Sequence, residues 1–245
     1  MKYKVVIDAG HGGSDFGYQD NGIVEKDYAL LISNYMKDRL DDLGIESIVT
    51  RNTDRTLSDD DRISIITSAF ENNDDVIVVS NHLNKGNDSG IEIVYALRND
   101  DTFSSEIAKQ LMTSGGVVNK YYQLRDPINT MYDSISIIRD TPYYETVMIE
   151  YGYVNDSLDA DKIKDKYLDY AEAVIRAITV YTGNEYKPLE SSNYYVVKKG
   201  DTLWRIAINY GVSVEDIKSF NNLSSNNLDI GQVLYIPILD KEETP

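Results

Sequence analysis

Cysteine is absent from this chain of 245 residues, and histidine occurs only twice, at His11 and His82. Without cysteine there is no disulfide framework and no thiolate chemistry, so a bound transition metal would have to be held by histidine and carboxylate groups. No apolar run approaches the length of a membrane-spanning helix, and the first residues reach the charged Asp8 too soon for a signal peptide. We therefore expect a soluble chain without an export signal.

Basic residues are also scarce, because 24 Lys and Arg stand against 41 Asp and Glu, for a formal net charge of -17. A chain this acidic is repelled by nucleic-acid phosphates and by anionic membranes, so we expect neither as a partner. A neutral polymer or a cation is a more favourable partner. The length allows one large domain or two smaller ones, and we favour two.

From the start to about residue 181, short β-branched runs alternate with stretches of helical period. This order is typical of an α/β fold, with a mostly parallel sheet flanked by helices. Strands are expected at 3–7, 45–50, 76–80, 91–95 and 147–149, and helices at 27–43, 58–70, 104–111 and 161–181. Ser58 and Asp61 have the spacing of a capping box. Residues 115–139 show no clear pattern.

Residues 183–193 have the composition of a linker, since they are small and polar and have no apolar period. After them the pattern predicts a strand at 194–197, helices at 202–210 and 213–220, and a strand at 233–236. This βααβ order predicts a small α+β domain, with Thr202 and Ser213 as helix N-caps. The expected division is 1–182, a linker at 183–193, a second domain at 194–237 and an acidic tail at 238–245.

Both histidines follow predicted strands. His11 lies in a glycine-rich turn after the first strand, and His82 follows the run from Val76 to Ser80. Because the carboxyl ends of parallel strands meet at one edge of a sheet, we expect the two imidazoles to converge there. A catalytic zinc site commonly has three nitrogen or oxygen ligands, so the third would be a carboxylate, which composition cannot choose. A structural or solvent-exposed histidine pair is the alternative. The glycine spacing fits no nucleotide-binding loop.

Several short motifs then occur in a fixed order along the first 181 residues. They are Asp8-Ala9-Gly10-His11-Gly12-Gly13, Gly22-Ile23-Val24-Glu25-Lys26, Thr50-Arg51, Ser80-Asn81-His82-Leu83-Asn84, Gly90-Ile91-Glu92 and Met148-Ile149-Glu150-Tyr151-Gly152-Tyr153-Val154-Asn155. Together they resemble the zinc-dependent N-acetylmuramoyl-L-alanine amidases, a family of cell-wall hydrolases with His, Glu and His ligands. The resemblance implies that His11, Glu25 and His82 hold Zn²⁺ and that Glu150 is the catalytic carboxylate.

The sequence departs from the family at Asn81, where an aliphatic residue is usual, and at Tyr153-Val154, where Phe-Leu is usual. We expect these changes to alter packing and not activity. Apart from the resemblance, Glu25 would be an acid favoured in a first helical turn, and Glu150 a strand-end ion-pair partner. Arg51 and Arg62 are expected to be structural. Most of the 20 tyrosines are expected in core and boundary positions, with Tyr151 and Tyr153 as candidates for carbohydrate contact.

The second part resembles a LysM module, a family that binds N-acetylglucosamine-containing glycans. The similarity lies in Tyr195-Val196-Val197-Lys198-Lys199-Gly200-Asp201-Thr202-Leu203-Trp204-Arg205-Ile206-Ala207, Tyr210-Gly211-Val212-Ser213, Asn221 and Gly231-Gln232-Val233-Leu234-Tyr235-Ile236-Pro237. It implies a shallow groove between two loops, with Gly200, Asp201, Thr202, Leu203, Leu228, Asp229 and Ile230 as candidate glycan-binding residues. We expect Trp204 in the core, because a lone tryptophan of a small helix is more often packed than exposed.

The two resemblances together imply an enzyme that cleaves the amide between N-acetylmuramic acid and L-alanine in peptidoglycan with a zinc-activated water. The LysM module would hold it on the cell wall. We expect a monomeric phage or prophage endolysin that is cytoplasmic before release, with a sporulation or mother-cell-lysis autolysin as the alternative. A non-catalytic peptidoglycan-binding protein on an inactive amidase scaffold and a glycosidase are the alternatives from other classes.

Overall fold

The computed structural model describes residues 3–70, 75–188, 192–198, 200–221, 223–229 and 231–237. The chain divides into two compact units, Met1–Tyr186 and Lys187–Pro245. Of the expected linker, residues 189–191 lie outside the described residues, as does the whole expected tail at 238–245. Within the described ranges, no helix has both the length and the apolar character needed to cross a membrane.

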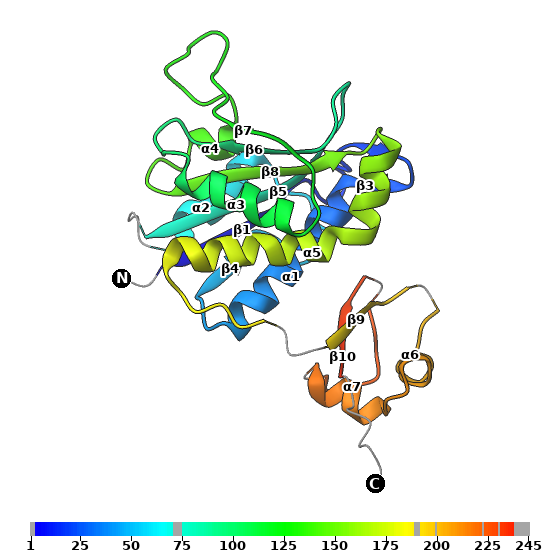
Figure 1. The fold of residues 1–245 in the computed structure, drawn as a ribbon. Helices are drawn as coiled ribbons and strands as arrows, with labels where there is room; N and C mark the ends of the chain where they lie inside the picture. Colours follow the sequence, from blue (N-terminus) through cyan, green and yellow to red (C-terminus); the bar gives the residue numbers. More distant parts are fainter. Residues whose placement is uncertain are drawn as a thin grey trace. The chain divides into compact units, whose positions relative to one another are not determined.

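A six-stranded sheet forms the centre of the first unit, in the order β4-β1-β5-β8-β6-β7 (Figure 1). The strands are β1 (Lys4–Ala9), β4 (Ser47–Val49), β5 (Val76–Asn84), β6 (Ile91–Tyr95), β7 (Val118–Tyr122) and β8 (Glu145–Tyr153). Strands β4, β1, β5 and β8 run parallel, whereas β6 pairs antiparallel with β8 and parallel with β7. The predicted α/β fold with a mostly parallel sheet is therefore confirmed.

Helices cover both faces of this sheet. The first unit has α1 (Glu25–Asp42), α2 (Asp59–Ala69), α3 (Thr102–Thr113), α4 (Ser136–Arg139) and α5 (Ser157–Thr182). Helices α1, α3 and α5 pack together, whereas α2 packs with α4 (Figure 1). Val6 and Val78 face the second group and form one buried cluster with Ile66 and Ile137. Since β1 and β5 are buried along nearly their whole length, both sides of the sheet are core.

Local sequence signals explain several helix ends. The predicted capping box of α2 is present, because the Ser58 side chain accepts from the Asp61 backbone and the Asp61 side chain accepts from the Ser58 backbone. Asp156 caps α5 through the N–H groups of Leu158 and Asp159. Helix α5 ends at Gly183, whose φ of 69° is the left-handed conformation that glycine adopts readily.

Some elements differ from the prediction. Helix α1 begins at Glu25 and α5 at Ser157, each earlier than the apolar period suggests, because first helical turns are often polar. A short hairpin of β2 (Gln19–Asp20) and β3 (Ile23–Val24) precedes α1. The unassigned segment 115–139 contains β7 and α4. Strand β7 was missed because it is a mostly exposed edge strand without an apolar pattern.

The second unit has the predicted βααβ order. Its elements are β9 (Ser192–Val196), α6 (Leu203–Tyr210), α7 (Val214–Phe220) and β10 (Val233–Pro237), with β9 and β10 antiparallel. Thr202 and Ser213 are the helix N-caps, as predicted. The core of this unit consists of Val197, Leu203, Ile206, Ala207, Ile217, Leu234 and Ile236.

The prediction that Trp204 is a core residue is wrong, because 66% of it is exposed. Leu203, Ile206 and Ala207 share the inward face of α6 and are buried. Trp204 and Ile208, four residues apart, share the outer face, where Ile208 is 56% exposed. The small module fills its core with aliphatic side chains and leaves the indole at the surface.

Candidate metal centre

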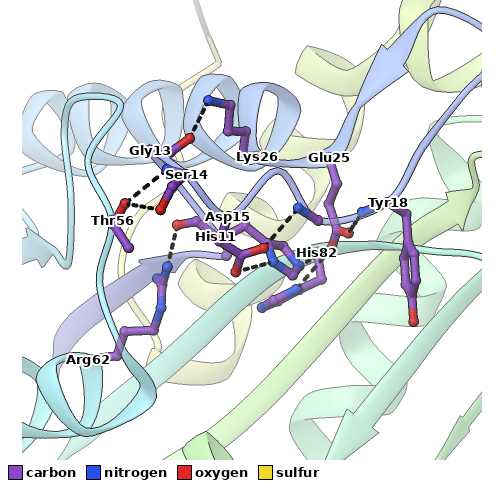
Figure 2. A network of polar contacts seen from close by, with 12 residues as sticks. His11, Gly13, Ser14, Asp15, Tyr18, Glu25, Lys26, Thr56, Arg62 and His82 are labelled. Atoms are coloured by element: carbon purple, nitrogen blue, oxygen red, sulfur yellow. Dashed lines mark hydrogen bonds and ion pairs between the residues drawn. The ribbon is translucent and has the colours of Figure 1, made fainter.

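His11, Glu25 and His82 meet at the carboxyl edge of the central sheet. His11 lies in the turn after β1, His82 is in β5, and Glu25 is the first residue of α1. One ligand atom from each lies within 4.8 Å of the others, so the predicted convergence of the two imidazoles is present (Figure 2). The imidazole rings stand edge to face, with centroids 5.1 Å apart. The acid that joins them is Glu25.

The turn that carries His11 has an unusual backbone. His11 has a φ of 59°, and Gly12 and Gly13 that follow also have positive φ values. Gly10 has a different role, because a Cβ there would lie only 2.4 Å from the His82 ring. The close approach of the turn to His82 therefore depends on the missing side chain at Gly10.

Glu25 is a buried carboxylate, only 1% exposed. Its Oε1 lies 3.0 Å from His11 Nε2 and 3.1 Å from His82 Nδ1, and it accepts from the Leu83 N–H at 3.0 Å. Its Oε2 accepts from the Tyr18 N–H at 2.8 Å. Burial by itself would raise the pKa of Glu25, but the two histidines outweigh burial and lower the pKa to about 2. Glu25 is thus an ionised carboxylate at neutral pH.

A second carboxylate orients His11. Asp15 Oδ2 lies 2.8 Å from His11 Nδ1, which leaves Nε2 directed at Glu25. Metal-bound histidines commonly bond their other ring nitrogen to such a carboxylate, which fixes the ring and raises its basicity. Burial lowers the pKa of His11, but Glu25 and Asp15 act more strongly together, so the pKa is raised.

The donor set fits Zn²⁺. Two imidazole nitrogens and one carboxylate oxygen, with a fourth position left open, are typical of catalytic zinc sites. Bonds of about 2.0–2.1 Å in tetrahedral geometry place neighbouring donor atoms about 3.3 Å apart. The Glu25 oxygen lies 3.0 and 3.1 Å from the two nitrogens. In the part of the chain that the structure describes, no other group of histidine and acidic side chains meets the same criterion.

Glu150 lies beside this centre, on the neighbouring strand. In the parallel pairing of β5 and β8 its register partner is His82. Its Oε2 is buried and has no hydrogen-bond partner among the residues that the structure describes. Burial chiefly, with the charges of Glu25 and Glu92, raises the pKa of Glu150 to about 7. A carboxyl group with such a pKa can take up and release a proton near neutral pH.

Glu92 is the last residue of the motif Gly90-Ile91-Glu92, for which the sequence predicts no chemical role. Because β6 runs antiparallel to β8, Glu92 lies opposite Glu150 in the ladder. It is 2% exposed and accepts from the Tyr153 hydroxyl at 2.7 Å, while Lys120 Nζ lies 3.1 Å away. Glu92 is opposite Glu150 only because β6 runs antiparallel to β8, and no sequence pattern predicts that direction.

Tyr151 and Tyr153 do not form a carbohydrate surface, contrary to the prediction. They are only 2% and 5% exposed. The Tyr151 hydroxyl donates to Asn81 Oδ1 at 2.8 Å, and the Tyr153 hydroxyl donates to Glu92. Tyr151 follows Glu150 directly in β8, so its ring enters the core on the other face of the sheet. A register shift between Glu150 and Tyr153 interrupts this alternation, and the Tyr153 hydroxyl reaches Glu92.

A cavity of about 170 Å³ opens next to both histidines. It is lined by His11, Asp15, Leu57, Asp59, Arg62, His82, Ile135, Ser136, Ile137 and Met148. Arg62 also has the expected structural role, because it pairs with buried Asp8 at 2.8 Å. It also donates to the His11 carbonyl (Figure 2). The cavity therefore lies directly beside two of the three candidate metal ligands.

The candidate glycan-binding residues lie at one end of the second unit. The Gly231 N–H donates to the Val197 carbonyl, so the two loops leave neighbouring strand ends. Gly200, Thr202 and Asp229 are exposed. Asp201 accepts from the Tyr195 hydroxyl at 2.7 Å. Leu203 is only 2% exposed, Leu228 packs against the core, and Ile230 lies outside the described residues.

Comparison with known proteins finds one family match in each part of the chain. The sequence profile of the N-acetylmuramoyl-L-alanine amidase family matches residues 5–180, and that of the LysM domain matches residues 195–237. The chain is 32% identical to the uncharacterized protein YqiI of Bacillus subtilis over 185 residues, which cover 72% of this chain and 84% of YqiI.

Two solved structures have a similar fold. Cwp6 from Clostridium difficile is 25% identical with a TM-score of 0.66, covering 74% of this chain and 29% of Cwp6. The catalytic domain of CwlV, an N-acetylmuramoyl-L-alanine amidase from Bacillus (Paenibacillus) polymyxa var. colistinus, is 24% identical with a TM-score of 0.64. That match covers 76% of this chain and all of the CwlV domain.

Proposed function

This chain belongs to the N-acetylmuramoyl-L-alanine amidase family and ends in a LysM domain, and from that premise we propose that it is a zinc-dependent peptidoglycan hydrolase. The proposed zinc ligands are His11, Glu25 and His82, and the proposed catalytic residue is Glu150. The observation that carries the proposal is the meeting of the three ligand atoms within 4.8 Å beside a buried, unpartnered carboxylate oxygen. The bond cleaved would be the amide between N-acetylmuramic acid and L-alanine.

Zinc at this site would supply Lewis acidity, which eases the loss of a proton from water and offsets the negative charge that builds on the substrate carbonyl oxygen. Glu150 would accept the proton of the attacking water as its oxygen bonds to the carbonyl carbon. Glu150 would then deliver that proton to the alanine nitrogen as the carbon–nitrogen bond breaks. The buried position of Glu150 supports this role, since a pKa of about 7 suits both transfers.

We propose that residues 1–182 form the catalytic domain, 183–193 a linker, 194–237 the glycan-binding domain and 238–245 a tail. The module would raise the local concentration of the enzyme on the wall without taking part in the chemistry. The proposed glycan contacts are Gly200, Asp201, Thr202, Leu203, Leu228, Asp229 and Ile230, where buried Leu203 would contribute through its backbone. Removing residues 183–245 should spare cleavage of a soluble muropeptide and reduce cleavage of intact walls.

Digestion of purified peptidoglycan tests the reaction. The zinc-loaded chain should release new L-alanine amino termini and no new reducing sugars. Glu150→Gln keeps the size of the side chain but cannot accept the proton, so turnover should fall by about 10²–10⁴-fold while zinc binding remains. Near-normal turnover by this variant would refute the role of Glu150.

The same digestion separates the alternatives. A glycosidase would release reducing ends by means of two carboxylates and would need no metal. A binding protein on an inactive scaffold would release neither product, even with zinc present. L-Alanine termini that disappear on chelation and return with zinc would support the amidase proposal against both.

We further propose that the protein is a monomeric phage or prophage endolysin, held in the cytoplasm until the membrane is opened. This proposal is supported by the organisation of the chain into two units, one of which resembles a wall hydrolase and the other a wall-binding module. Cells producing it should stay intact until a pore-forming agent is added and should then lyse. Lysis without that agent would contradict the proposed endolysin role. A dimer measured by light scattering would contradict the proposed monomeric state.

A further inference from the structure

Arg51 is a buried arginine, only 1% exposed, that follows the edge strand β4. Within the described part of the chain, all of its hydrogen bonds go to backbone carbonyl oxygens. Nε donates to Ala9 at 3.0 Å, Nη1 to Thr53 at 3.3 Å, and Nη2 to both Gly10 and Lys26 at 2.7 Å. Among the described residues the neighbouring ion pairs join Arg62 to Asp8 and Lys26 to Asp54, and neither includes Arg51. Burying a charged group without a directly bonded opposite charge costs free energy, so we expect Arg51 to have a specific role at this position.

Two of these carbonyls adjoin proposed metal ligands. Gly10 immediately precedes His11 in the turn after β1, and Lys26 immediately follows Glu25 in the first turn of α1. A single nitrogen, Nη2 of Arg51, bonds both carbonyls and therefore joins two segments that are not adjacent strands. Backbone pairing within the sheet fixes His82 but fixes neither His11 nor Glu25.

The environment of Arg51 is tightly packed. A Cβ on Gly12, the residue after His11, would lie 2.9 Å from Arg51 Nε. The turn is thus folded against the guanidinium at a point where His11 has the left-handed φ of 59°. A positive φ is uncommon for a non-glycine residue, so contacts around the turn help to hold this conformation.

We propose that Arg51 is a positioning residue that sets the placement of His11 relative to Glu25 for the metal, an inference that rests on the proposed zinc site. The planar guanidinium offers donors in a fixed arrangement, which can hold two carbonyls at once. Its positive charge, in contrast, disfavours a nearby divalent cation. If Arg51 acts by holding the two carbonyls in place, its loss should weaken zinc binding. If it acts only through its charge, its loss should strengthen zinc binding.

Two substitutions separate these effects. Arg51→Lys keeps the charge but replaces the planar fork with a flexible ammonium group. Arg51→Met removes the charge and all donors. If Arg51 acts through geometry, both variants bind zinc more weakly, and Met more so than Lys. If it acts only through its charge, Met binds zinc more tightly than wild type, and Lys binds it equally well.

Arg98 provides a matched control, because it also donates to backbone carbonyls, those of Ile138 at 2.7 Å and Tyr144 at 3.0 Å. It follows β6 at the opposite edge of the sheet from His82. Arg98→Lys should lower the melting temperature of the metal-free protein without changing zinc affinity. Any loss of zinc affinity specific to Arg51 is then separate from a general loss of stability.

The experiment measures the zinc dissociation constant of the full-length chain by competition with a chromogenic chelator, together with the melting temperature of each metal-free variant. We expect Arg51→Lys to weaken zinc binding about 10-fold and Arg51→Met more, which is the range for residues that support metal ligands. Unchanged or tighter binding in a folded Arg51 variant overturns the positioning role. If Arg51→Met does not fold, Arg51→Lys decides alone. A wild-type chain that binds no zinc overturns the zinc site itself.

Discussion

His82 on β5 and Glu150 on β8 are register partners at the carboxyl edge of the sheet. One proposed metal ligand and the proposed proton acceptor are therefore held relative to each other by the hydrogen bonds of two buried strands. Rigid elements hold functional groups more accurately than loops do. His11 and Glu25 lie in a turn and at a helix start, so substitutions around those two should affect the site most readily.

Gly10→Ala is a steric test of the site. A Cβ at Gly10 would lie 2.4 Å from the His82 ring, so the ring would have to move. We expect zinc affinity to fall about 10-fold or more, as measured by chelator competition. Gly44→Ala is the control, because its Cβ would meet nothing within 4 Å while its φ of 67° still strains the backbone. Equal zinc affinity in Gly10→Ala and wild type would contradict the geometry.

Asp15→Ala tests the support of His11. Loss of the carboxylate 2.8 Å from Nδ1 leaves the imidazole free to rotate, so zinc affinity should fall about 10–100-fold. Asp15→Asn keeps a hydrogen-bonding group and should lose less. Asp161→Asn, a change in a surface ion pair of α5, is the control and should leave zinc affinity intact. If all three variants bind zinc alike, Asp15 does not orient the ligand.

Zinc affinity should depend on pH through His11. Its pKa is raised because Glu25 and Asp15 outweigh the effect of burial. Zinc must displace the proton from the ligating nitrogen, so affinity should weaken as the pH falls from about 8 to about 6. Calorimetry in buffers of different ionisation enthalpy should detect proton release on binding. A binding constant that is flat across this range, with no released proton, would be the contrary result.

Glu145 makes a separate prediction for stability, at the opposite end of β8 from Glu150. Burial, with the charge of Asp100, raises its pKa to about 7 from 4.5. Its Oε1 is buried and finds no hydrogen-bond partner in the described ranges. The folded state therefore binds this proton more tightly than the unfolded state does. That contribution is complete below about pH 4.5 and is lost as the pH rises to about 7.

Glu145→Gln removes this titration, so the variant should be more stable than wild type at pH 8. We expect a rise in the melting temperature of about 2–4 °C for roughly 1 kcal/mol, and little difference at pH 4.5. Thermal unfolding at both pH values measures the effect. The account of Glu145 fails if the variant is equally stabilised at both pH values or destabilised at pH 8.

The sequence predicts the sheet and the meeting of the histidines well, because buried β-branched runs mark strands and parallel strands end at one edge. It does not identify Glu25 by pattern alone, since an acid in a first helical turn is common; only the family resemblance singled it out. No local sequence pattern predicts the direction of β6. The position of Glu92 opposite Glu150 depends on that direction, so it could not be predicted either. The exposed Trp204 could not be predicted, because residue type alone does not say which helix face is filled.

The most direct test is an equilibrium zinc titration of the metal-stripped, full-length chain beside Glu25→Ala, His82→Ala and Glu150→Gln. We expect one zinc per chain for wild type and Glu150→Gln, and loss of the site in Glu25→Ala and His82→Ala. A wild-type chain that takes up no zinc would refute the proposed metal site, and so would a His82→Ala chain that binds zinc as tightly as wild type.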